Sequence, residues 1–258
     1  MMKISFRLDA PSRTTDVYIK PGVLTEIAAL LPEGFHTTSA VIITDSNVGP
    51  LYADRVQGSF RASGLEAKSF TFNAGEPSKS LQTASQIYAF LADARMPRDG
   101  LIVALGGGVV GDLAGFVAGT WMRGVPWVFC PTTLEADVDA CVGGKTAVNL
   151  AGGKNLVGVF HHPMIVAVDP NCLCTLPERD VCAGLAESIK HALLESPDAV
   201  SWHEKNASNI LALKSSTINE LIERNLRFKA QIVSEDPYER LDRRIILNFG
   251  HTIGHAIE

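Results

Sequence analysis

The amino-acid sequence predicts an α/β N-terminal domain with a mostly parallel sheet, followed by an all-α C-terminal domain. Two patterns support this prediction. From the start to about residue 170, short β-branched and apolar runs alternate with stretches of helical periodicity, and after Leu176-Pro177 the strand signals end. Strands separated by helices favour a parallel sheet with the helices packed on its faces. We therefore divide the chain into residues 1–176 and residues 177–258.

Strands are predicted from short apolar runs, and helices where apolar residues recur every three or four positions. The predicted strands are Val41–Thr44, Leu101–Leu105, Val125–Phe129 and Met164–Val168, and the predicted helices are Leu24–Leu31, Leu81–Asp93, Glu178–Leu194, Ile210–Val233 and a last one from Ile245 onward. Because Glu258 falls inside a helix with no stop signal after it, we expect a truncated helical domain.

The composition is typical of a globular cytoplasmic protein. The 258 residues are 46% hydrophobic and 20% charged, and the net charge of −5 is spread along the chain, so we expect no nucleic-acid partner and no membrane surface. The apolar stretch Leu101–Gly119 contains Asp112 and a glycine run, which favours strand, turn and helix over a membrane span. The five cysteines lack zinc-knuckle spacing, which indicates reduced thiols in the cytoplasm.

A glycine-rich turn follows one of the predicted strands. Residues 106–111 satisfy G-x-G-x-x-G, and such a turn lets backbone N–H groups approach a pyrophosphate at a helix N-terminus. A single match to this pattern is about as often a purely structural turn as a nucleotide-binding site. The acidic residue expected about 20 positions later is missing, and Asp45 at the end of an earlier strand is the better ribose ligand. Gly143-Gly144-Lys145-Thr146 resembles the end of a P-loop, but Asp139 stands where that motif needs glycine.

Several longer motifs occur in order along nearly the whole chain. They are TDSNV, GEPSKS, GGGVVGDLAGFVAGTWMRG, PTTLEADVDACVGGKTAVN, GGKNLVGVFHHP, TLPERDVCAGLAESIKHA and LNFGHTIGHAIE. This series closely resembles the 3-dehydroquinate synthases, a family of sugar-phosphate cyclases. The resemblance implies a Rossmann-like, NAD-binding α/β domain, then a helical domain, with the active site between them.

The resemblance also implies which residues contact the cofactor, although turn and capping chemistry would account for many of the same residue types. The implied NAD contacts are Asp45, Asn47, Glu76, Lys79, Gly107, Gly108, Asp112, Thr132, Thr133, Asp139, Lys145, Lys154, Thr175 and Leu176.

A polar stripe is predicted on the last helix. At 100° per residue, Arg244, Asn248, His251, His255 and Glu258 share one side, which favours a ligand-facing stripe over a solvated face. Spacing alone would pair His251 and His255 on a zinc ion. The resemblance instead implies that His251 is a metal ligand and that His255 is a catalytic residue beside the substrate.

The resemblance assigns Glu187 as a second ligand of a zinc or cobalt ion, and it implies a third ligand beyond Glu258. From spacing alone, Glu187 and Lys190 would form an exposed i, i+3 ion pair. Lys229 lies on an apolar stripe and needs a partner, for which a substrate carboxylate would serve unless the lysine reaches solvent.

Further site residues follow from the resemblance. Lys190 and Lys154 correspond to active-site lysines, and Arg123 to a phosphate contact from a partner subunit, which implies a homodimer. The residues that correspond to substrate and phosphate binders are Lys145, Asn155, Lys229, Arg244 and Asn248. We expect Lys145 and Arg244 to act on the phosphate and not on fold stability.

The implied reaction converts 3-deoxy-D-arabino-heptulosonate 7-phosphate to 3-dehydroquinate and phosphate in the shikimate pathway, with NAD regenerated in each turnover. Alternatives are a valiolone or deoxyinosose synthase, a glycerol dehydrogenase-like enzyme, or a non-catalytic NAD-binding fragment. Glu135 and Asp137 are acidic where the family is usually neutral, so they would weaken NAD binding unless they face solvent. Cys141 and His191 replace the usual serine and tyrosine.

Overall fold

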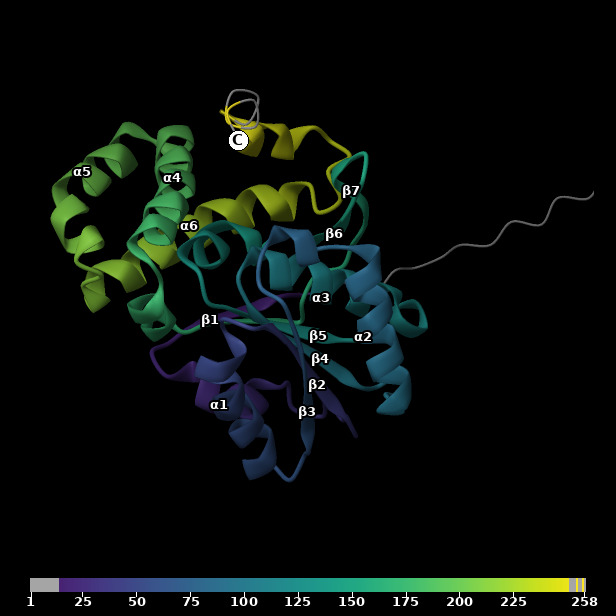
Figure 1. The fold of residues 1–258 in the computed structure, drawn as a ribbon. Coiled ribbons are helices and arrows are strands. Elements are labelled where there is room, and N and C mark those ends of the chain that lie inside the picture. The colour runs from purple at the N-terminus through teal and green to yellow at the C-terminus, as the bar shows by residue number, and fades with distance from the viewer. Residues whose placement is uncertain (1–13, 251–253, 255–256, 258) are drawn as a thin grey trace, which may run out of the picture.

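The computed structural model describes residues 14–250, 254 and 257. A six-stranded sheet lies at its centre, in the order β1-β8-β5-β4-β2-β3, and every neighbouring pair is parallel (Figure 1). This confirms the predicted α/β fold. The strands are β1 (Asp16–Ile19), β2 (Ala40–Asp45), β3 (Ala67–Phe72), β4 (Leu101–Gly106), β5 (Trp127–Pro131) and β8 (Ile165–Val168).

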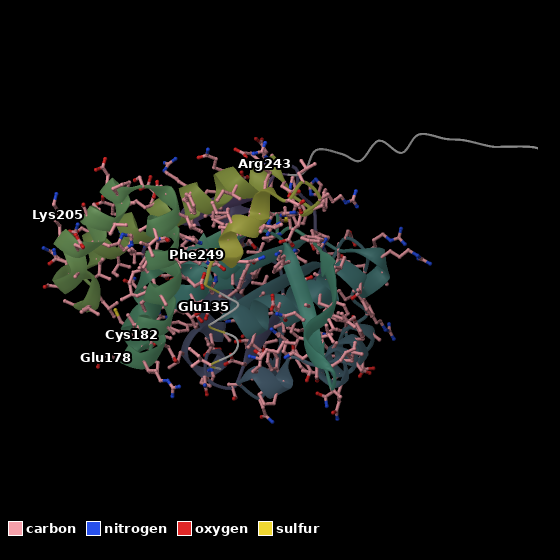
Figure 2. All side chains as sticks on the ribbon, turned by 90° about the horizontal axis from the view of Figure 1, so that it is seen from above. Glu135, Glu178, Cys182, Lys205, Arg243 and Phe249 are labelled. Atoms are coloured by element: carbon pink, nitrogen blue, oxygen red, sulfur yellow. The ribbon has the colours of Figure 1, made fainter. Side chains whose placement is uncertain are left out.

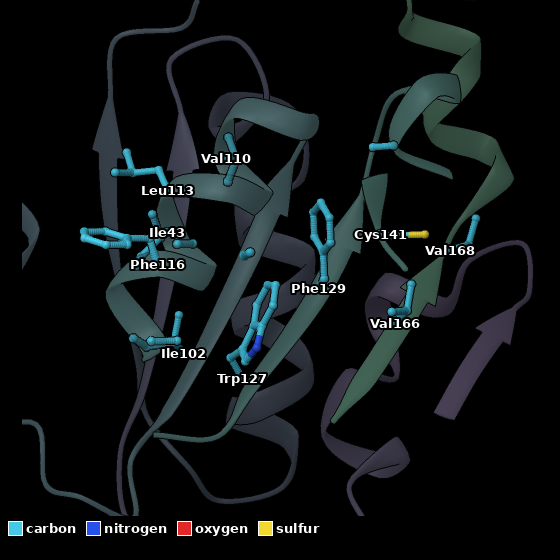
Figure 3. Packing of buried hydrophobic residues seen from close by; sticks show 14 of the residues in the cluster. Ile43, Ile102, Val110, Leu113, Phe116, Trp127, Phe129, Cys141, Val166 and Val168 are labelled. Atoms are coloured by element: carbon cyan, nitrogen blue, oxygen red, sulfur yellow. The ribbon is translucent and has the colours of Figure 1, made fainter. Parts of the chain in front are cut away.

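Helices cover both faces of the sheet, which explains why its central strands are apolar throughout. On one face, α1 (Gly49–Ala62) packs over side chains such as Ile42 and Val103. On the other, α2 (Leu81–Asp93) and α3 (Gly108–Thr120) pack over the alternate residues of the same strands. Figure 3 shows this second layer, with Trp127 and Phe129 beneath α3.

The first predicted helix is wrong in type. Instead of one helix over Leu24–Leu31, the chain forms two short 3-10 turns, Val23–Thr25 and Ile27–Leu30. Their apolar side chains still face the core. The sequence pattern therefore predicts which residues are buried but not which type of helix they form. The strands β1 and β3 and the helix α1 were not predicted. The remaining short turns are Glu76–Ser78, Trp121–Arg123, the π-helical turn Ala136–Ala140, and Pro170–Thr175.

A separate β-hairpin, also not predicted, lies beside α3. Its strands are β6 (Lys145–Leu150) and β7 (Gly153–Phe160), which pair antiparallel. Lys145 therefore begins a strand instead of preceding a helix, which agrees with the rejection of a P-loop at residues 143–146. The hairpin lies at the same edge of the molecule as the carboxyl ends of the central strands (Figure 1). Its residues Lys154 and Asn155 line a cavity together with the strand-end residue Asp45.

The helical region begins at Glu178, as predicted. It contains α4 (Glu178–Glu195), α5 (Pro197–Leu211) and α6 (Ser215–Glu235), which lie together at one side of the sheet (Figure 1). The predicted helix Ile210–Val233 is therefore wrong at its start, because the chain turns between α5 and α6, where Leu213 has a φ of 49°. No helix among the described residues combines the length and hydropathy that crossing a membrane requires.

The last predicted helix also differs. Residues Arg243–Asn248 form a 3-10 helix, and Gly250 follows with a φ of 83°. A 3-10 helix has three residues per turn, so positions four apart no longer share a side. Arg244 is accordingly buried while Asn248 is exposed, and the polar stripe does not extend across these two residues. His251, His255 and Glu258 lie outside the described residues.

Candidate active site

The carboxyl ends of three adjacent strands form the base of a large cavity. Asp45 ends β2, Gly107 follows β4, and Thr132 follows β5, and these strands are neighbours in the sheet. The cavity has a volume of about 670 Å³. Its wall includes most of the predicted cofactor contacts, namely Asp45, Asn47, Glu76, Lys79, Gly107, Gly108, Asp112, Thr132, Thr133, Lys154, Thr175 and Leu176.

The start of α3 is shaped for an anionic ligand. Gly107 caps the helix and Gly108 is its first residue, so the unpaired N–H groups of the first turn face the cavity. A Cβ atom on Gly107 would come within 2.8 Å of the side chain of Thr133. At Gly108 the nearest atom would be 3.9 Å away, which leaves room there for a ligand to approach the backbone.

Asp45 is fixed by the loop that follows it. Its Oδ1 accepts the backbone N–H groups of Asn47 and Val48 at 2.8 and 2.9 Å. Thr132 lies across the cavity, and its buried Oγ1 has no hydrogen-bond partner within the described part of the chain. A buried hydroxyl without a partner is costly, and a bound polar ligand would remove that cost.

An ion-pair group lies on the cavity wall between α2 and α3. The Lys79 Nζ is 3.0 Å from Asp112 Oδ2 and 3.1 Å from Glu76 Oε1. Burial alone would lower the pKa of Lys79, but the two carboxylates outweigh it and raise that pKa. Burial also raises the pKa of Asp112. Asn149 of the hairpin donates to Glu76 at 2.7 Å, so the hairpin is attached to this wall.

A second, smaller cavity of about 440 Å³ adjoins the first, because Asp112 and Asn155 line both. Lys145 lies in this second cavity and not on the wall of the first. Its Nζ pairs with Glu239 at 2.7 Å, and half of its side chain is exposed. Asn155 has a φ of 58°, and its N–H donates to Asn149 Oδ1 at 2.8 Å, which fixes the hairpin turn between the two cavities.

Asp139 also lies apart from the first cavity's wall, in a cluster of charged side chains beside α4 and α6. The π-helical turn Ala136–Ala140 directs its carboxylate toward Lys229, whose Nζ is 2.9 Å from Oδ1 and also donates to the Asp139 carbonyl. His191 Nε2 lies 3.2 Å from the same Oδ1. Burial would raise the pKa of Asp139, but Lys229, His191 and Lys190 hold it well below its usual range.

Lys229 therefore has a partner within the protein. It is only 6% exposed, so it does not reach solvent along its apolar stripe. The predicted pair of Glu187 and Lys190 is also present, but the side chain of Lys190 is 9% exposed and the pair is not a surface pair.

Glu187, Asp139 and His191 together offer ligand atoms of the kinds that zinc prefers. One oxygen or nitrogen atom from each lies within 4.8 Å of the other two. The sequence marks His191 only as a substitution for tyrosine. Its position four residues after Glu187 on α4 places the two side chains on one face of the helix, which is the signal for its place in this site. Asn225 and Glu239 also contact site residues and had no signal in the sequence, because their contacts join distant segments.

The remaining predicted substrate residues occupy different environments. Arg244 is 2% exposed and donates to the carbonyl oxygens of Gly143 and Pro237 at 3.1 and 3.2 Å. Burial lowers the pKa of this guanidinium. These contacts join the loop before β6 to the chain after α6, so we now expect Arg244 to contribute to fold stability as well. Arg123 is exposed at a strained turn, with a φ of 70°.

Glu135 and Asp137, the two acidic residues that are unusual for the family, lie in different environments. Glu135 lines the first cavity, and burial, followed by the nearby Glu187, raises its pKa. Asp137 is fully buried, and neither of its carboxylate oxygens has a hydrogen-bond partner among the described residues. Burial raises its pKa well above the usual value. Of these two residues, only Glu135 adds a carboxylate to the cavity wall, and Figure 2 shows it beside the helical region.

The sequence comparisons cover nearly the whole chain. Family models described as 3-dehydroquinate synthase N-terminal and C-terminal match residues 69–183 and 184–258. The 3-dehydroquinate synthase of Desulforamulus reducens is 44% identical over 254 residues, which are 98% of this chain and 70% of that protein. The enzyme of the same name from Symbiobacterium thermophilum is 44% identical over 246 residues, 94% of this chain and 68% of that one.

Solved structures of related cyclases have the same fold. A 2-epi-5-epi-valiolone synthase from Streptomyces hygroscopicus subsp. jinggangensis, with NAD+ and Zn2+ bound, is 26% identical with a TM-score of 0.86, covering 98% of this chain and 70% of that one. A 2-deoxy-scyllo-inosose synthase is 32% identical with a TM-score of 0.84, covering 94% and 68%. A glycerol dehydrogenase from Schizosaccharomyces pombe, at 19% identity and a TM-score of 0.64, shares the fold alone. By its family models and its curated relatives, this chain belongs to the 3-dehydroquinate synthase family.

Proposed function

We propose that this protein is a 3-dehydroquinate synthase, which converts 3-deoxy-D-arabino-heptulosonate 7-phosphate to 3-dehydroquinate and phosphate. The observation that carries the proposal is the junction of two cavities. The larger one, at the strand ends, has the size and the helix N-terminus that a dinucleotide needs, and the smaller one contains Lys145. Asp112 and Asn155 line both, so a cofactor and a sugar phosphate would meet there.

NAD fits the larger cavity. Asp45 is held by two backbone N–H groups on one oxygen and would offer the other to a ribose hydroxyl. Gly108 would admit the pyrophosphate, and the Thr132 hydroxyl, which has no partner in the part of the chain that the structure describes, would gain one. NAD would supply a reversible hydride acceptor. Lys79, whose ammonium group is held by Asp112 and Glu76, would place a positive charge beside the cofactor.

A divalent metal, zinc or cobalt, fits beside Glu187. The carboxylate and imidazole donors around it are those that zinc prefers, and His251 is proposed as a second ligand. The metal would polarise the substrate oxygen that loses hydride. Lys190 contacts Glu187 and would lie next to the reacting sugar with Lys154 and His255.

The remaining assignments concern substrate and assembly. Lys145, Asn155, Arg244 and Asn248 would bind the phosphate, and Lys229 would bind toward the carboxylate end. Asp139, paired through Oδ1 with Lys229, would direct its other oxygen to a sugar hydroxyl. The exposed Arg123 would reach the phosphate of a partner subunit in a homodimer, and the protein would act in the cytoplasm.

Product analysis tests this function. The metal-loaded enzyme would be incubated with NAD and, in separate reactions, with the heptulosonate 7-phosphate and with the sugar phosphates that valiolone and deoxyinosose synthases use. We expect release of phosphate and 3-dehydroquinate from the first substrate alone. A cyclic product from one of the other sugars would identify a related cyclase, and NAD binding without any product would identify a non-catalytic protein.

A further inference from the structure

A β-bulge in the hairpin lies beside the two cavities. The neighbours of Asn149 in β6 pair with Val157 and Gly153, so Asn149 alone lies opposite residues 154–156 of β7. A bulge of this kind bends the strand and redirects the side chains of the extra residues. One of these, Asn155, has a φ of 58° and lines both cavities. The bulge therefore determines how Asn155 enters the site.

The side-chain amide of Asn149 has one partner at each end. Its Oδ1 accepts the backbone N–H of Asn155 at 2.8 Å, and its Nδ2 donates to Glu76 Oε1 at 2.7 Å. The orientation of the amide is fixed, because a backbone N–H can only donate and must face the amide oxygen. The oxygen thus holds the bulge, and the nitrogen holds a residue on the wall of the larger cavity.

Glu76 connects this amide to Lys79. Among the described residues, both contacts of the Glu76 carboxylate use Oε1, which accepts from Asn149 and lies 3.1 Å from Lys79 Nζ. Its Oε2 is therefore left for a ligand in the cavity. The backbone N–H of Asn149 also donates to the Lys79 carbonyl at 2.8 Å. Because that bond does not involve the Asn149 side chain, a substitution there keeps the hairpin attached to the wall.

We propose that Asn149 is a positioning residue, whose amide oxygen holds Asn155 in the bulge and whose amide nitrogen orients the Glu76 carboxylate. The inference rests on the proposed synthase function, in which Glu76 contacts NAD and Asn155 contacts the sugar phosphate. The two ends of one amide thus act on two different ligands. Asn149→Asp separates them, because it keeps an oxygen for the Asn155 N–H and removes the donor to Glu76.

Calorimetry with NAD and steady-state kinetics of the metal-loaded enzyme test the proposal. Asn149→Leu removes both hydrogen bonds, and we expect it to weaken NAD binding and to raise the KM for the sugar phosphate, each by about tenfold. Asn149→Asp places a second carboxylate against Glu76. It should weaken NAD binding by about tenfold or more and leave the KM for the sugar phosphate close to that of wild type.

A combined variant tests whether the amide nitrogen acts through Glu76. Asn149→Asp together with Glu76→Gln exchanges the amide and the carboxylate, so one donor and one acceptor again face each other. This exchange should recover part of the NAD affinity that Asn149→Asp alone loses. Asn206→Leu is the matched control, because Asn206 donates to the Trp202 carbonyl within α5 and lies on neither cavity wall. It should leave NAD affinity and turnover unchanged.

Amide hydrogen exchange separates this inference from the proposed function, because it needs neither NAD nor turnover. Asn155 is exposed, and its N–H donates to Asn149 Oδ1. We expect slow exchange of this N–H in wild type and in Asn149→Asp, and fast exchange in Asn149→Leu. If this pattern occurs without synthase activity, the proposed function fails and the positioning of the bulge stands. Fast exchange in wild type, equal effects of Asn149→Asp on both ligands, or no recovery in the exchanged pair would overturn the positioning role.

Discussion

The cofactor cavity and the Asp139 cluster lie next to each other but are built differently. The base of the cavity is formed by backbone and short side chains at the ends of β2, β4 and β5, with room beside Gly108. The cluster consists of long side chains from α4, α6 and the turn after β5, with Asp139 held by Lys229 and His191. The lysines of the cluster already have carboxylate partners, whereas the Thr132 hydroxyl in the cavity has no hydrogen-bond partner within the described residues. The difference indicates that a ligand would supply a missing hydrogen bond in the cavity, and that the ion pairs of the cluster form before any ligand binds.

The largest expected effect follows from breaking the cluster. Lys229→Met should destabilise the protein by about 3 kcal/mol, the lower end of the range for a buried pair that loses one partner, because the Asp139 side chain is 25% exposed. Asp139 has a depressed pKa when folded, so its stabilisation is present above pH ~4 and is lost as the pH falls through the folded pKa. The difference between wild type and variant in urea unfolding should therefore shrink in acid.

Arg227→Met is the matched control, because Arg227 forms an exposed i, i+4 pair with Glu223 on the same helix. This substitution should lower the free energy of unfolding by no more than about 0.5 kcal/mol. Equal losses of stability in the two variants would show that the cluster contributes no more than a surface pair.

The second prediction contrasts Asp139 with Asp137, two residues earlier, whose carboxylate has no hydrogen-bond partner among the described residues. Asp137→Asn should stabilise the protein at neutral pH and have little effect near pH 4. Its carboxyl has a raised pKa when folded, so the unfolded chain ionises first as the pH rises above ~4. The gain in the free energy of unfolding should grow as the pH rises and level off above the folded pKa. Thermal unfolding between pH 4 and 8 measures it, and a gain independent of pH would contradict the burial of an unpaired carboxyl.

The third prediction concerns the ribose end of the cavity. Asp45→Ala should weaken NAD binding about tenfold or more in calorimetry, through loss of a charge-assisted hydrogen bond of roughly 1.5–3 kcal/mol. Asp45→Asn is the matched control for the fold, since it retains an oxygen for the N–H groups of Asn47 and Val48. Unchanged NAD affinity in Asp45→Ala would exclude Asp45 as a ribose ligand.

The smallest effect is expected from substitutions of two adjacent glycines, Gly107 and Gly108. Gly108→Ala should leave the melting temperature near that of wild type and weaken NAD binding, because its Cβ would enter space that the pyrophosphate needs. Gly107→Ala should instead lower the melting temperature, since its Cβ would meet Thr133 at 2.8 Å. Calorimetry and thermal unfolding of both variants test this, and unaltered NAD affinity in Gly108→Ala would place the pyrophosphate elsewhere.

The sequence by itself determined the family, the parallel sheet and the strand-end residues around the cofactor cavity. These features depend on local patterns, since apolar runs end at Asp45, Gly107 and Thr132, and each strand end follows from its own neighbours in the sequence. The long motifs supplied the helical residues as well, including Glu187 and Lys190, which pair as their i, i+3 spacing indicates.

Only the tertiary structure decided how the charged residues are paired and which of them are buried. Asp139 is one of the predicted cofactor contacts, and a π-helical turn directs it to Lys229, 90 residues away along the chain. Arg244 was predicted on a ligand-facing helical stripe, but a 3-10 helix places it against Gly143. Sequence periodicity predicts which residues share one side of a regular helix. It carries no information on irregular turns or on partners from distant segments. The contacts of such residues are set by packing between elements, which a single sequence does not record.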